Sequence, residues 1–377
     1  MTIDYSVLPS PCFVLEEKRL RQNLAQLARV EQQAGVSIIL AFKAFAMWSV
    51  FPIIREYLSG ATASSLFEAQ LCFEEMGVKA HTYAPAYLSE DMDQVLQYSS
   101  HITFNSLSQF DLYREKAKQA GISCGLRINP EYSEVETALY DPCAPGSRLG
   151  VAAKSLAQGL PDGIEGLHFH NLFEANPSAL EATLKSVEEK FAPHLEKVKW
   201  VNMGGGHLIT GKTYDSAYLI DLLIRFRQKY GVQVILEPGS AIAWQTGFLQ
   251  TTILDLVEHE GIKTAMIDAS FTAHMPDTLE MPYRPIIREA LPSGTSSYGY
   301  RIGGMTCLAG DFLDTYYFEK PLAVGDVLIF EDMMHYTMVK TNMFNGVKHP
   351  SIAIWTCDDQ VKILRQFDYT DFKARLS

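Results

Sequence analysis

Long hydrophobic runs are absent from this sequence, and no apolar stretch is long enough to cross a bilayer. The first residues also lack the basic segment and apolar core of a secretory signal. The six cysteines form no Cys-x-x-Cys pair and no spacing typical of metal ligands. Because a chain of 377 residues can bury a sizeable core without disulfides, we expect a cytoplasmic protein with reduced thiols.

Positive charge is scarce as well. The chain carries 32 Lys and Arg against 44 Asp and Glu, a net charge of −12. This balance disfavours nucleic acids and anionic membranes as partners, and it is compatible with a cationic ligand. No Gly-x-Gly-x-x-Gly follows the first predicted strand, which argues against a dinucleotide-binding fold.

Between Gly35 and Gly239, short β-rich runs alternate with helical stretches. The runs with strand character are SIILAF (37–42), GATAS (60–64), HTYAP (81–85), HITFN (101–105), SCGLRIN (123–129), EGLHFH (165–170), KWVNMG (199–204) and VQVILEPG (232–239). Helical stretches at 66–76, 106–121 and 215–231 end at or before a glycine. Eight strands with intervening helices predict an α/β fold, a (β/α)8 TIM-type barrel; an open doubly wound sheet is the alternative.

After residue 240 the pattern changes to β-rich runs with turns at Gly and Pro, and helical periodicity is scarce until the last few residues. We expect a second, mainly antiparallel β domain, which the N-terminal run PCFVLEE (11–17) would join. The predicted barrel therefore spans 20–245, and the predicted β domain combines 1–19 with 246–377.

Chemically useful residues stand at the C-terminal ends of the predicted barrel strands, where such barrels hold their active sites. Lys43 lies in the apolar stretch AFKAFAMWSV (41–50), where a charged amine is costly to desolvate without a partner. Apolar surroundings lower the pKa of a lysine and prepare it to form a Schiff base. A lysine that extends to solvent, or that pairs with a carboxylate, is the alternative.

Three further strand ends face the same predicted mouth. The run Gly204, Gly205, Gly206 allows close backbone approach and could bind phosphate through N–H groups, or could be a flexible loop. His170 could stack on a flat cofactor, or could bind metal with His168, although no third ligand of obvious spacing accompanies them. Glu237 is costly at the end of an apolar strand unless paired, and a protonated pyridine nitrogen would be a suitable partner.

The predicted β domain holds two more candidate segments. The stretch YRIGGMTCLAGDFLD places Cys307 and Asp311 in a Gly-rich turn, where a cysteine alone would be a small buried hydrophobe. The stretch FEDMMHYTMVKTNMFNG carries Tyr336 and Phe344 in a strand-like context, where packing is the simplest role.

Taken in order, these motifs resemble the fold-type III decarboxylases that depend on pyridoxal 5′-phosphate (PLP). The set comprises the lysine on the first strand, the histidine, the glycine run, Glu-Pro-Gly, G-x-x-C-x-x-x-D and FEDM-x-x-YT-x-x-x-x-x-x-FNG. That group includes ornithine, arginine and diaminopimelate decarboxylases and is related in fold to alanine racemase. The resemblance covers essentially the whole chain.

Within the group, several stretches are similar to the carboxynorspermidine/carboxyspermidine decarboxylase family. They are AFKAFA (41–46), HFHNLFE (168–174), NMGGGHLIT (202–210), DASFTAHMPDTLEMPYRP (268–285) and GGMTCLAGDFLD (303–314). Diaminopimelate and ornithine decarboxylases generally carry His-x-Gly-Ser and Glu-Pro-Gly-Arg, where this chain has His170-Asn171-Leu172-Phe173 and Glu237-Pro238-Gly239-Ser240. These departures weaken a diaminopimelate assignment, because its distal carboxylate requires a cation.

For the barrel, the resemblance implies that Lys43 holds PLP through a Schiff base and that His170 stacks on its ring. Glu237 would pair with the ring nitrogen and contribute to substrate binding. Arg148 matches a basic position near the barrel mouth. The phosphate would be bound by Gly204, Gly205 and Gly206, with Tyr336 from the β domain. No metal is implied.

For the β domain, the resemblance implies that Asp277 binds the distal amine of a polyamine substrate, with Glu280 as a helper. Cys307 and Asp311 would reach across a homodimer interface into the neighbouring site. There Cys307 would donate a proton to Cα, and Asp311 would lie near the substrate amine.

The implied activity is PLP-dependent decarboxylation of carboxynorspermidine, carboxyspermidine or both in polyamine biosynthesis. Competing hypotheses are a decarboxylase of another basic amino acid such as diaminopimelate, a non-catalytic PLP-binding regulatory homologue, a racemase, and a metal-dependent barrel. The preference between the norspermidine and spermidine skeletons stays open, because one methylene is worth only about 1–3 kcal/mol in an apolar pocket.

Overall fold

The computed structural model describes residues 4–135, 140–280, 283–292, 294 and 296–377. The chain divides into two units: one combines the N-terminal residues up to Gln22 with Ala243–Ser377, and the other spans Asn23–Ile242. Residues 1–3 of the predicted β domain, and residues 281–282 of the motif at 268–285, lie outside the described residues.

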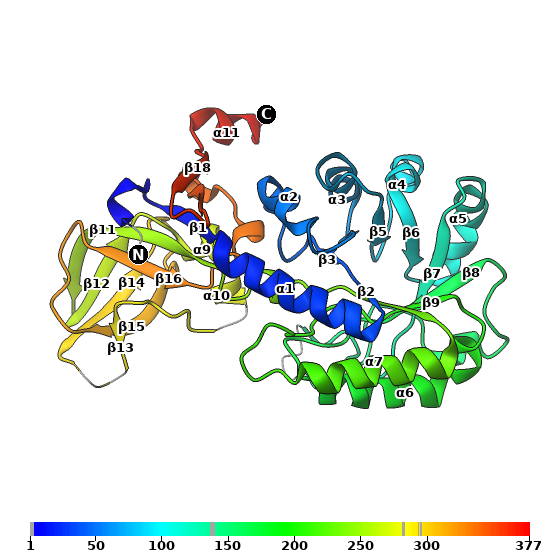
Figure 1. The fold of residues 1–377 in the computed structure, drawn as a ribbon. Helices are drawn as coiled ribbons and strands as arrows, with labels where there is room; N and C mark the ends of the chain where they lie inside the picture. Colours follow the sequence, from blue (N-terminus) through cyan, green and yellow to red (C-terminus); the bar gives the residue numbers. More distant parts are fainter. Residues whose placement is uncertain (1–3, 136–139, 281–282, 293, 295) are drawn as a thin grey trace. The chain divides into compact units, whose positions relative to one another are not determined.

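The Asn23–Ile242 unit is built on a parallel sheet of nine strands in the order β2-β10-β9-β8-β7-β6-β5-β4-β3 (Figure 1). The strands are β2 (Ser37–Ile38), β3 (Leu40–Ala41), β4 (Ala61–Ala63), β5 (Ala80–Tyr83), β6 (Ser99–Phe104), β7 (Ser123–Arg127), β8 (Ile164–His168), β9 (Trp200–Asn202) and β10 (Gln233–Leu236). The two edge strands, β2 and β3, are halves of the first predicted run, interrupted at Ile39. The sheet therefore nearly closes on itself, which confirms the barrel prediction; the open-sheet alternative is wrong.

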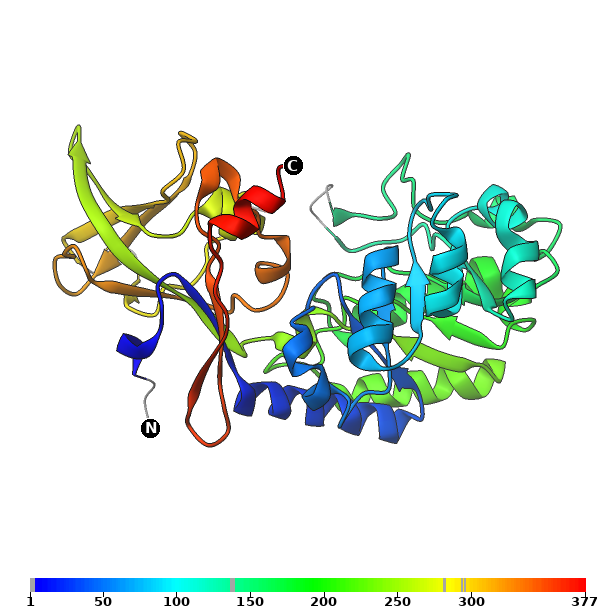
Figure 2. The same cartoon turned by 90° about the horizontal axis from the view of Figure 1, so that it is seen from above.

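Helices cover the outside of these strands (Figures 1 and 2). They are α1 (Glu17–Ala34), α2 (Phe51–Ile54), α3 (Leu66–Leu71), α4 (Met92–Tyr98), α5 (Leu107–Gln119), α6 (Pro177–Leu195), α7 (Ser216–Tyr230) and α8 (Ser240–Ala243). The stretch expected at 66–76 forms α3 followed by one π turn, Cys72–Met76. It ends at Gly77, whose φ of 68° is the left-handed conformation typical of a helix C-terminus.

Trp200 of β9 fills the barrel interior beneath the strand ends. A Cβ atom at Gly125 of β7 would lie 2.3 Å from the Trp200 ring, and one at Gly166 of β8 would lie 2.0 Å from it. Two glycines therefore make room for one indole. Residues two apart in a strand share a face, so Asn202 also points into the barrel interior. It lies one layer closer than Trp200 to the C-terminal ends of the strands.

The other unit is a nine-stranded mixed sheet in the order β13-β15-β14-β12-β11-β1-β17-β18, with β16 also paired to β11. Its strands are β1 (Cys12–Glu16), β11 (Gly247–His259), β12 (Ile262–Ile267), β13 (Ala290–Leu291), β14 (Tyr298–Gly303), β15 (Phe312–Phe318), β16 (Val327–Glu331), β17 (Ser351–Trp355) and β18 (Val361–Arg365). The pairs β12–β14 and β1–β17 are parallel and the others antiparallel. The predicted fold class, a barrel with a mainly antiparallel sheet, is therefore confirmed.

Short helices accompany this sheet: α9 (Phe271–His274), α10 (Asp277–Glu280) and α11 (Tyr369–Ala374). The strand-like context predicted for Tyr336 and Phe344 is wrong. The strand β16 ends at Glu331, Tyr336 has a φ of 49°, and Phe344 begins the 3-10 turn Phe344–Gly346. Asn and Gly in TNMFNG are turn-forming residues, and they outweigh the apolar pattern.

Within the described residues, no helix is long and apolar enough to cross a membrane. All six cysteines are unpaired.

Candidate active site

Lys43 lies just beyond β3, in a turn where the N–H groups of Ala44 and Phe45 donate to the carbonyl of Ala41. Its neighbours Phe42 and Ala44 are fully buried, but the Lys43 side chain has solvent-accessible surface. The expectation that the apolar stretch buries the lysine is therefore wrong. The protein around the amine still desolvates it and lowers the pKa of Lys43 from its ordinary 10.5.

Lys43 and His170 are in direct contact, with Lys43 Nζ 3.2 Å from His170 Nε2. The other ring nitrogen, Nδ1, accepts the N–H of Gly205 at 2.9 Å. A neutral imidazole that accepts at Nδ1 carries its proton on Nε2, so we assign the contact as Nε2–H donating to a neutral lysine amine. Desolvation and the nearby Lys43 hold the pKa of His170 well below 6.5, in agreement with this assignment.

The glycine run is required by close backbone contacts. A Cβ at Gly204 would lie 2.6 Å from the carbonyl oxygen of Phe169, one at Gly205 2.4 Å from that of Glu237, and one at Gly206 2.1 Å from that of Leu172. Gly204 and Gly206 also have positive φ, 68° and 87°.

Two of the three amides in this run are already in use. The N–H of Gly204 donates to Asn202 Oδ1 at 2.9 Å, and that of Gly205 donates to His170. Phosphate binding by backbone N–H groups would therefore fall to Gly206 and the residues that follow it, rather than to the whole run.

Glu237 follows β10 and is only 8% exposed. Its Oε1 accepts Asn202 Nδ2–H at 2.6 Å, and its Oε2 lies 3.8 Å from His168 Nε2. Desolvation raises the pKa of Glu237, while Asn202 and Lys43 oppose the rise. Neither ring nitrogen of the buried His168 has a hydrogen-bond partner in the part of the chain that the structure describes. Unsatisfied polar atoms beside a buried carboxylate suit a polar planar ligand.

The metal hypothesis for His168 and His170 gains no support. His168, in β8, faces Glu237 and Tyr83, whereas His170, beyond the strand end, faces Lys43. Among residues 4–135, 140–280, 283–292, 294 and 296–377, no three His, Cys, Asp or Glu side chains are arranged to hold a metal ion.

Two charged residues at this site were not predicted from the sequence. Arg127, at the end of β7, is 4% exposed, donates from Nη2 to the carbonyl of His170 at 3.0 Å, and lies over the Tyr83 ring. Glu68, in the first turn of α3, accepts the Ser64 N–H at 2.6 Å. A charged residue inside SCGLRIN, and the capping spacing Ser65-x-x-Glu68, were the available signals.

Arg148 is exposed. Burial raises the pKa of Tyr83, and the positive charges of Arg127 and Arg148 oppose this rise. Its carbonyl accepts Asn105 Nδ2–H at 2.8 Å. The structure thus brings Arg148 near Tyr83, the last residue of β5, and the predicted place of Arg148 at the barrel mouth stays a prediction.

In the sheet unit, Asp277 has one engaged and one free carboxylate oxygen. Oδ2 accepts the hydroxyls of Thr337, at 2.8 Å, and Tyr283, at 3.2 Å. Oδ1 is buried without a hydrogen-bond partner among the described residues. Glu280 is exposed and forms an ion pair with Lys340. Among the described residues, Asp277 therefore keeps a buried carboxylate oxygen that no donor reaches, whereas the charge of Glu280 is already paired with Lys340.

Cys307 and Asp311 share one turn between β14 and β15. Cys307 is exposed, whereas Asp311 is 4% exposed and its carboxylate accepts N–H groups of the same turn and of α9. Tyr336 has a positive φ of 49° and its ring lies edge-on to His335.

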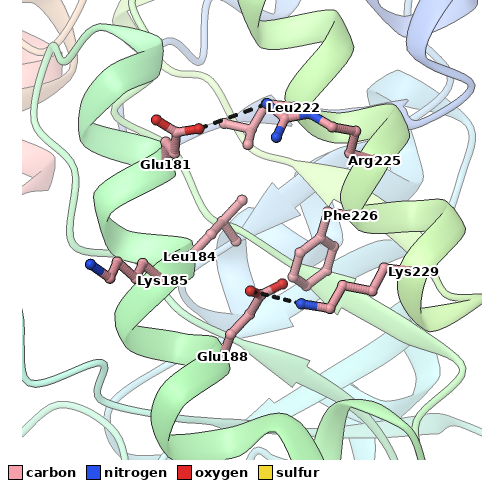
Figure 3. A pocket seen from close by; sticks show the side chains of 8 residues that line it. All are labelled: Glu181, Leu184, Lys185, Glu188, Leu222, Arg225, Phe226 and Lys229. Carbon is pink, nitrogen blue, oxygen red and sulfur yellow. Dashed lines mark ion pairs between the residues drawn. The ribbon is translucent and has the colours of Figure 1, made fainter.

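A groove on the outer face of the barrel lies between α6 and α7 (Figure 3). It is lined by Glu181, Leu184, Lys185, Glu188, Leu222, Arg225, Phe226 and Lys229. The ion pairs Glu181–Arg225, at 3.7 Å, and Glu188–Lys229, at 3.0 Å, join the two helices. Four of its five charged side chains are paired across the helices, and the groove contains none of the predicted site residues.

Comparison with known proteins agrees with this arrangement. Residues 12–334 match the family model described as pyridoxal-dependent decarboxylase, C-terminal sheet domain. The chain is 53% identical over 372 residues to the carboxyaminopropylagmatine decarboxylase of Synechocystis sp., covering 98% of this chain and 96% of that one. It is 42% identical over 382 residues to the carboxynorspermidine/carboxyspermidine decarboxylase of Campylobacter jejuni, covering 98% and 99%.

A solved structure shows the same fold. The carboxynorspermidine decarboxylase of Campylobacter jejuni, complexed with norspermidine, superposes with a TM-score of 0.91 at 41% identity. The match covers 98% of this chain and 100% of that one.

Two charges near Lys43 make its reactivity testable. Arg127 lowers the pKa of Lys43 and Glu68 raises it. We therefore expect Arg127→Gln to move the pH profile of Lys43 reactivity to higher pH, and Glu68→Gln, which keeps an acceptor for Ser64, to move it to lower pH. The rate of Lys43 labelling by pyridoxal phosphate, trapped with borohydride and counted by mass spectrometry, measures this profile. Shifts of the same sign in both variants would contradict the assigned electrostatics; Lys43→Arg is the unlabelled control.

Proposed function

Because the chain belongs to the pyridoxal-dependent decarboxylase family, we propose that it removes the α-carboxylate from carboxynorspermidine, carboxyspermidine or both. The products are norspermidine or spermidine, and carbon dioxide. The observation that carries the proposal is the full-length 42% identity to the Campylobacter jejuni enzyme named for both substrates, joined to a TM-score of 0.91 with its norspermidine complex. An acidic site for the amine tail fits the net charge of −12.

The residues of the barrel fit PLP. Lys43 supplies an amine of lowered pKa for covalent attachment, and the His170 ring beside it supplies a flat face. Glu237 supplies a buried carboxylate for the ring nitrogen, next to His168, whose two ring nitrogens have no hydrogen-bond partner among the described residues. When bound, the cofactor takes up the electron pair that remains on Cα after the carboxylate leaves.

The chain's own side chains have three tasks in this reaction. Glu237 would stabilise positive charge on the ring nitrogen of the cofactor, and Asn202 Nδ2–H holds this carboxylate by donating to Glu237 Oε1. Lys43 Nζ would hold the cofactor covalently, would give up that bond to the substrate amine at the start, and would take it back at the end, which frees the product amine. Cys307 Sγ returns a proton to Cα, which the family resemblance suggests occurs across a homodimer interface.

Asp277 Oδ1 is our candidate for the distal ammonium of the substrate. It is buried and lacks a hydrogen-bond partner within the described residues, and such an acceptor gains most from a charged donor. Glu280 stays a weaker candidate, because Lys340 already neutralises it.

A second candidate substrate is carboxyaminopropylagmatine, favoured by the 53% identity to the Synechocystis enzyme named for it. Its tail ends in a guanidinium, which binds a carboxylate best through two parallel N–H bonds to both oxygens. Asp277 Oδ2 already accepts two hydroxyls, which leaves one oxygen. The geometry therefore favours an ammonium tail over a guanidinium at this residue.

A regulatory role and a diaminopimelate substrate have weaker support. A non-catalytic regulatory homologue has no need of Lys43, Glu237 and Cys307 together, and full-length relatives at 53% and 42% identity are named as decarboxylases. A diaminopimelate substrate would need a cation for its distal carboxylate. The homodimer and the cytoplasmic location stay predictions from the sequence.

Removing the lysine amine tests the chemistry. We expect Lys43→Ala to lose measurable turnover and the absorbance of protein-linked cofactor, because no other assigned group can attach PLP. Spectroscopy of the purified variant, together with carbon dioxide release, measures both. A yellow, active Lys43→Ala protein would refute the assignment, and Arg148→Gln serves as a variant outside the attachment chemistry.

Substrate choice is tested by steady-state kinetics with added PLP on carboxynorspermidine, carboxyspermidine, carboxyaminopropylagmatine and diaminopimelate. We expect kcat/KM for the first two to exceed that for diaminopimelate by about 100-fold or more, because a mispaired charge in the site is costly. A preference for the agmatine derivative would replace the main proposal by the second candidate.

The tail assignment has its own test. Asp277→Asn keeps the size of the side chain and removes its charge, so we expect KM for the preferred triamine to rise about tenfold or more. PLP affinity, measured by fluorescence titration, should change much less. Glu280→Gln removes the weaker candidate in the same way, and we expect it to raise KM much less, because Lys340 already pairs with that charge. An unchanged KM in Asp277→Asn would remove Asp277 from the site.

A further inference from the structure

The turn that carries Cys307 is held by two side chains, one from the end of the turn itself and one from a distant part of the sheet unit. Asp311 binds one side of it, and Asn345, 38 residues along the chain, binds the amide of Cys307 itself. We propose that Asn345 is a positioning residue for the Cys307 thiol, and that Asp311 fixes the same turn rather than binding the substrate amine. This inference rests on the proposed function, in which Cys307 Sγ protonates Cα.

Asp311 has no acceptor capacity left for a substrate. Its Oδ1 accepts the N–H groups of Phe271 at 2.7 Å and Thr272 at 3.1 Å. Its Oδ2 accepts the N–H of Thr306 at 3.1 Å and the Thr306 hydroxyl at 2.6 Å. A carboxylate offers about four lone-pair sites, and all four are occupied here. A Cβ at Gly304 would lie 2.4 Å from this carboxylate, so the glycine makes room for it.

Asn345 reaches Cys307 from a strained turn. Its φ is 57°, a left-handed conformation that asparagine tolerates better than most residues with a side chain. Its Oδ1 accepts the Cys307 N–H at 2.8 Å. The next residue, Gly346, also has positive φ, 70°. The turn thus places an amide side chain where the cysteine backbone needs an acceptor.

Asp311 and the turn that carries Asn345 both contact the same short helix, α9. The N–H of Asn342 donates to the carbonyl of Ala273 at 2.8 Å, and Asn342 Oδ1 accepts the Phe344 N–H at 2.9 Å, which connects the Asn345 turn to α9. Asp311 binds the first amides of the same helix. Two sets of hydrogen bonds therefore fix the position of the Cys307 turn relative to helix α9.

The hydrogen bonds from Asp311 and Asn345 order an exposed turn, and this order would hold the proton donor in place for catalysis. Met305 and the residues from Cys307 to Gly310 are exposed, so the turn has little packing of its own to order it. A proton donor must be held close to its acceptor, and small displacements are costly in rate. Fixing the Cys307 amide fixes the origin of its short side chain, and so the reach of Sγ.

Four variants separate the hydrogen bond from the backbone conformation. Asn345→Gly keeps the left-handed φ and removes the acceptor, whereas Asn345→Asp keeps both. Asn345→Ser supplies a side chain too short to replace Oδ1 and serves if the glycine variant does not fold. Cys307→Ala removes the proton donor. Thermal melting checks that each variant is folded.

If Asn345 acts through the thiol, its effect must depend on the thiol. We expect Asn345→Gly to lower kcat about tenfold or more with KM nearly unchanged, and Asn345→Asp to stay within about threefold of the parent. In the Cys307→Ala background, Asn345→Gly should have no further effect. Equal losses in both backgrounds, or full activity of Asn345→Gly, would overturn the proposal.

A readout that needs no turnover separates this inference from the proposed function. Amide hydrogen exchange at Cys307 should be about tenfold or more faster in Asn345→Gly than in the parent, and near the parent rate in Asn345→Asp. Unchanged exchange would refute the positioning contact, whatever the substrate. If exchange changes as expected while the parent decarboxylates no carboxylated triamine, the contact stands, but the proposed function and the catalytic part of this inference fail together.

Discussion

Close backbone approach at the ends of β8, β9 and β10 sets the geometry of the barrel site. The glycine run passes so near the carbonyls of Phe169, Leu172 and Glu237 that a Cβ would lie 2.1–2.6 Å from them. At that separation the Gly205 N–H reaches His170 Nδ1. This one bond places the imidazole proton on Nε2 and directs it at Lys43, so the reactive amine depends on the absence of three side chains.

The same contact decides how charge is distributed at the site. With the Lys43–His170 contact made between two neutral groups, the buried Arg127 is the positive charge that acts on both Lys43 and the Glu237 carboxylate. A neutral amine avoids most of the desolvation cost of an ammonium and is the nucleophilic form. In the proposed reaction the exposure of Lys43 is useful, because a substrate amine would have to reach Nζ.

Sequence patterns predicted the elements and residues that carry a local signal. Strand runs, the lysine in an apolar stretch, three consecutive glycines and the acid before Pro-Gly are visible without knowing what they touch. Arg127, Asn202 and Glu68 were missed, because their roles come from contacts between different strands and helices. The strand-like prediction for Tyr336 and Phe344 was wrong, because alternating apolar residues concealed the turn-forming Asn345-Gly346 pair.

Asp277 and Asp311, which the family resemblance both places near substrate amines, differ in how many hydrogen bonds they already accept. Asp311 accepts four bonds and is complete, whereas Asp277 keeps one buried oxygen. A guanidinium tail would need a second acceptor beside that oxygen, and the nearest assigned acid in sequence, Glu280, is bound to Lys340. For such a tail, Lys340 would have to release Glu280 or Asp277 would have to give up a hydroxyl. An ammonium needs neither change, and this is the physical ground for preferring it.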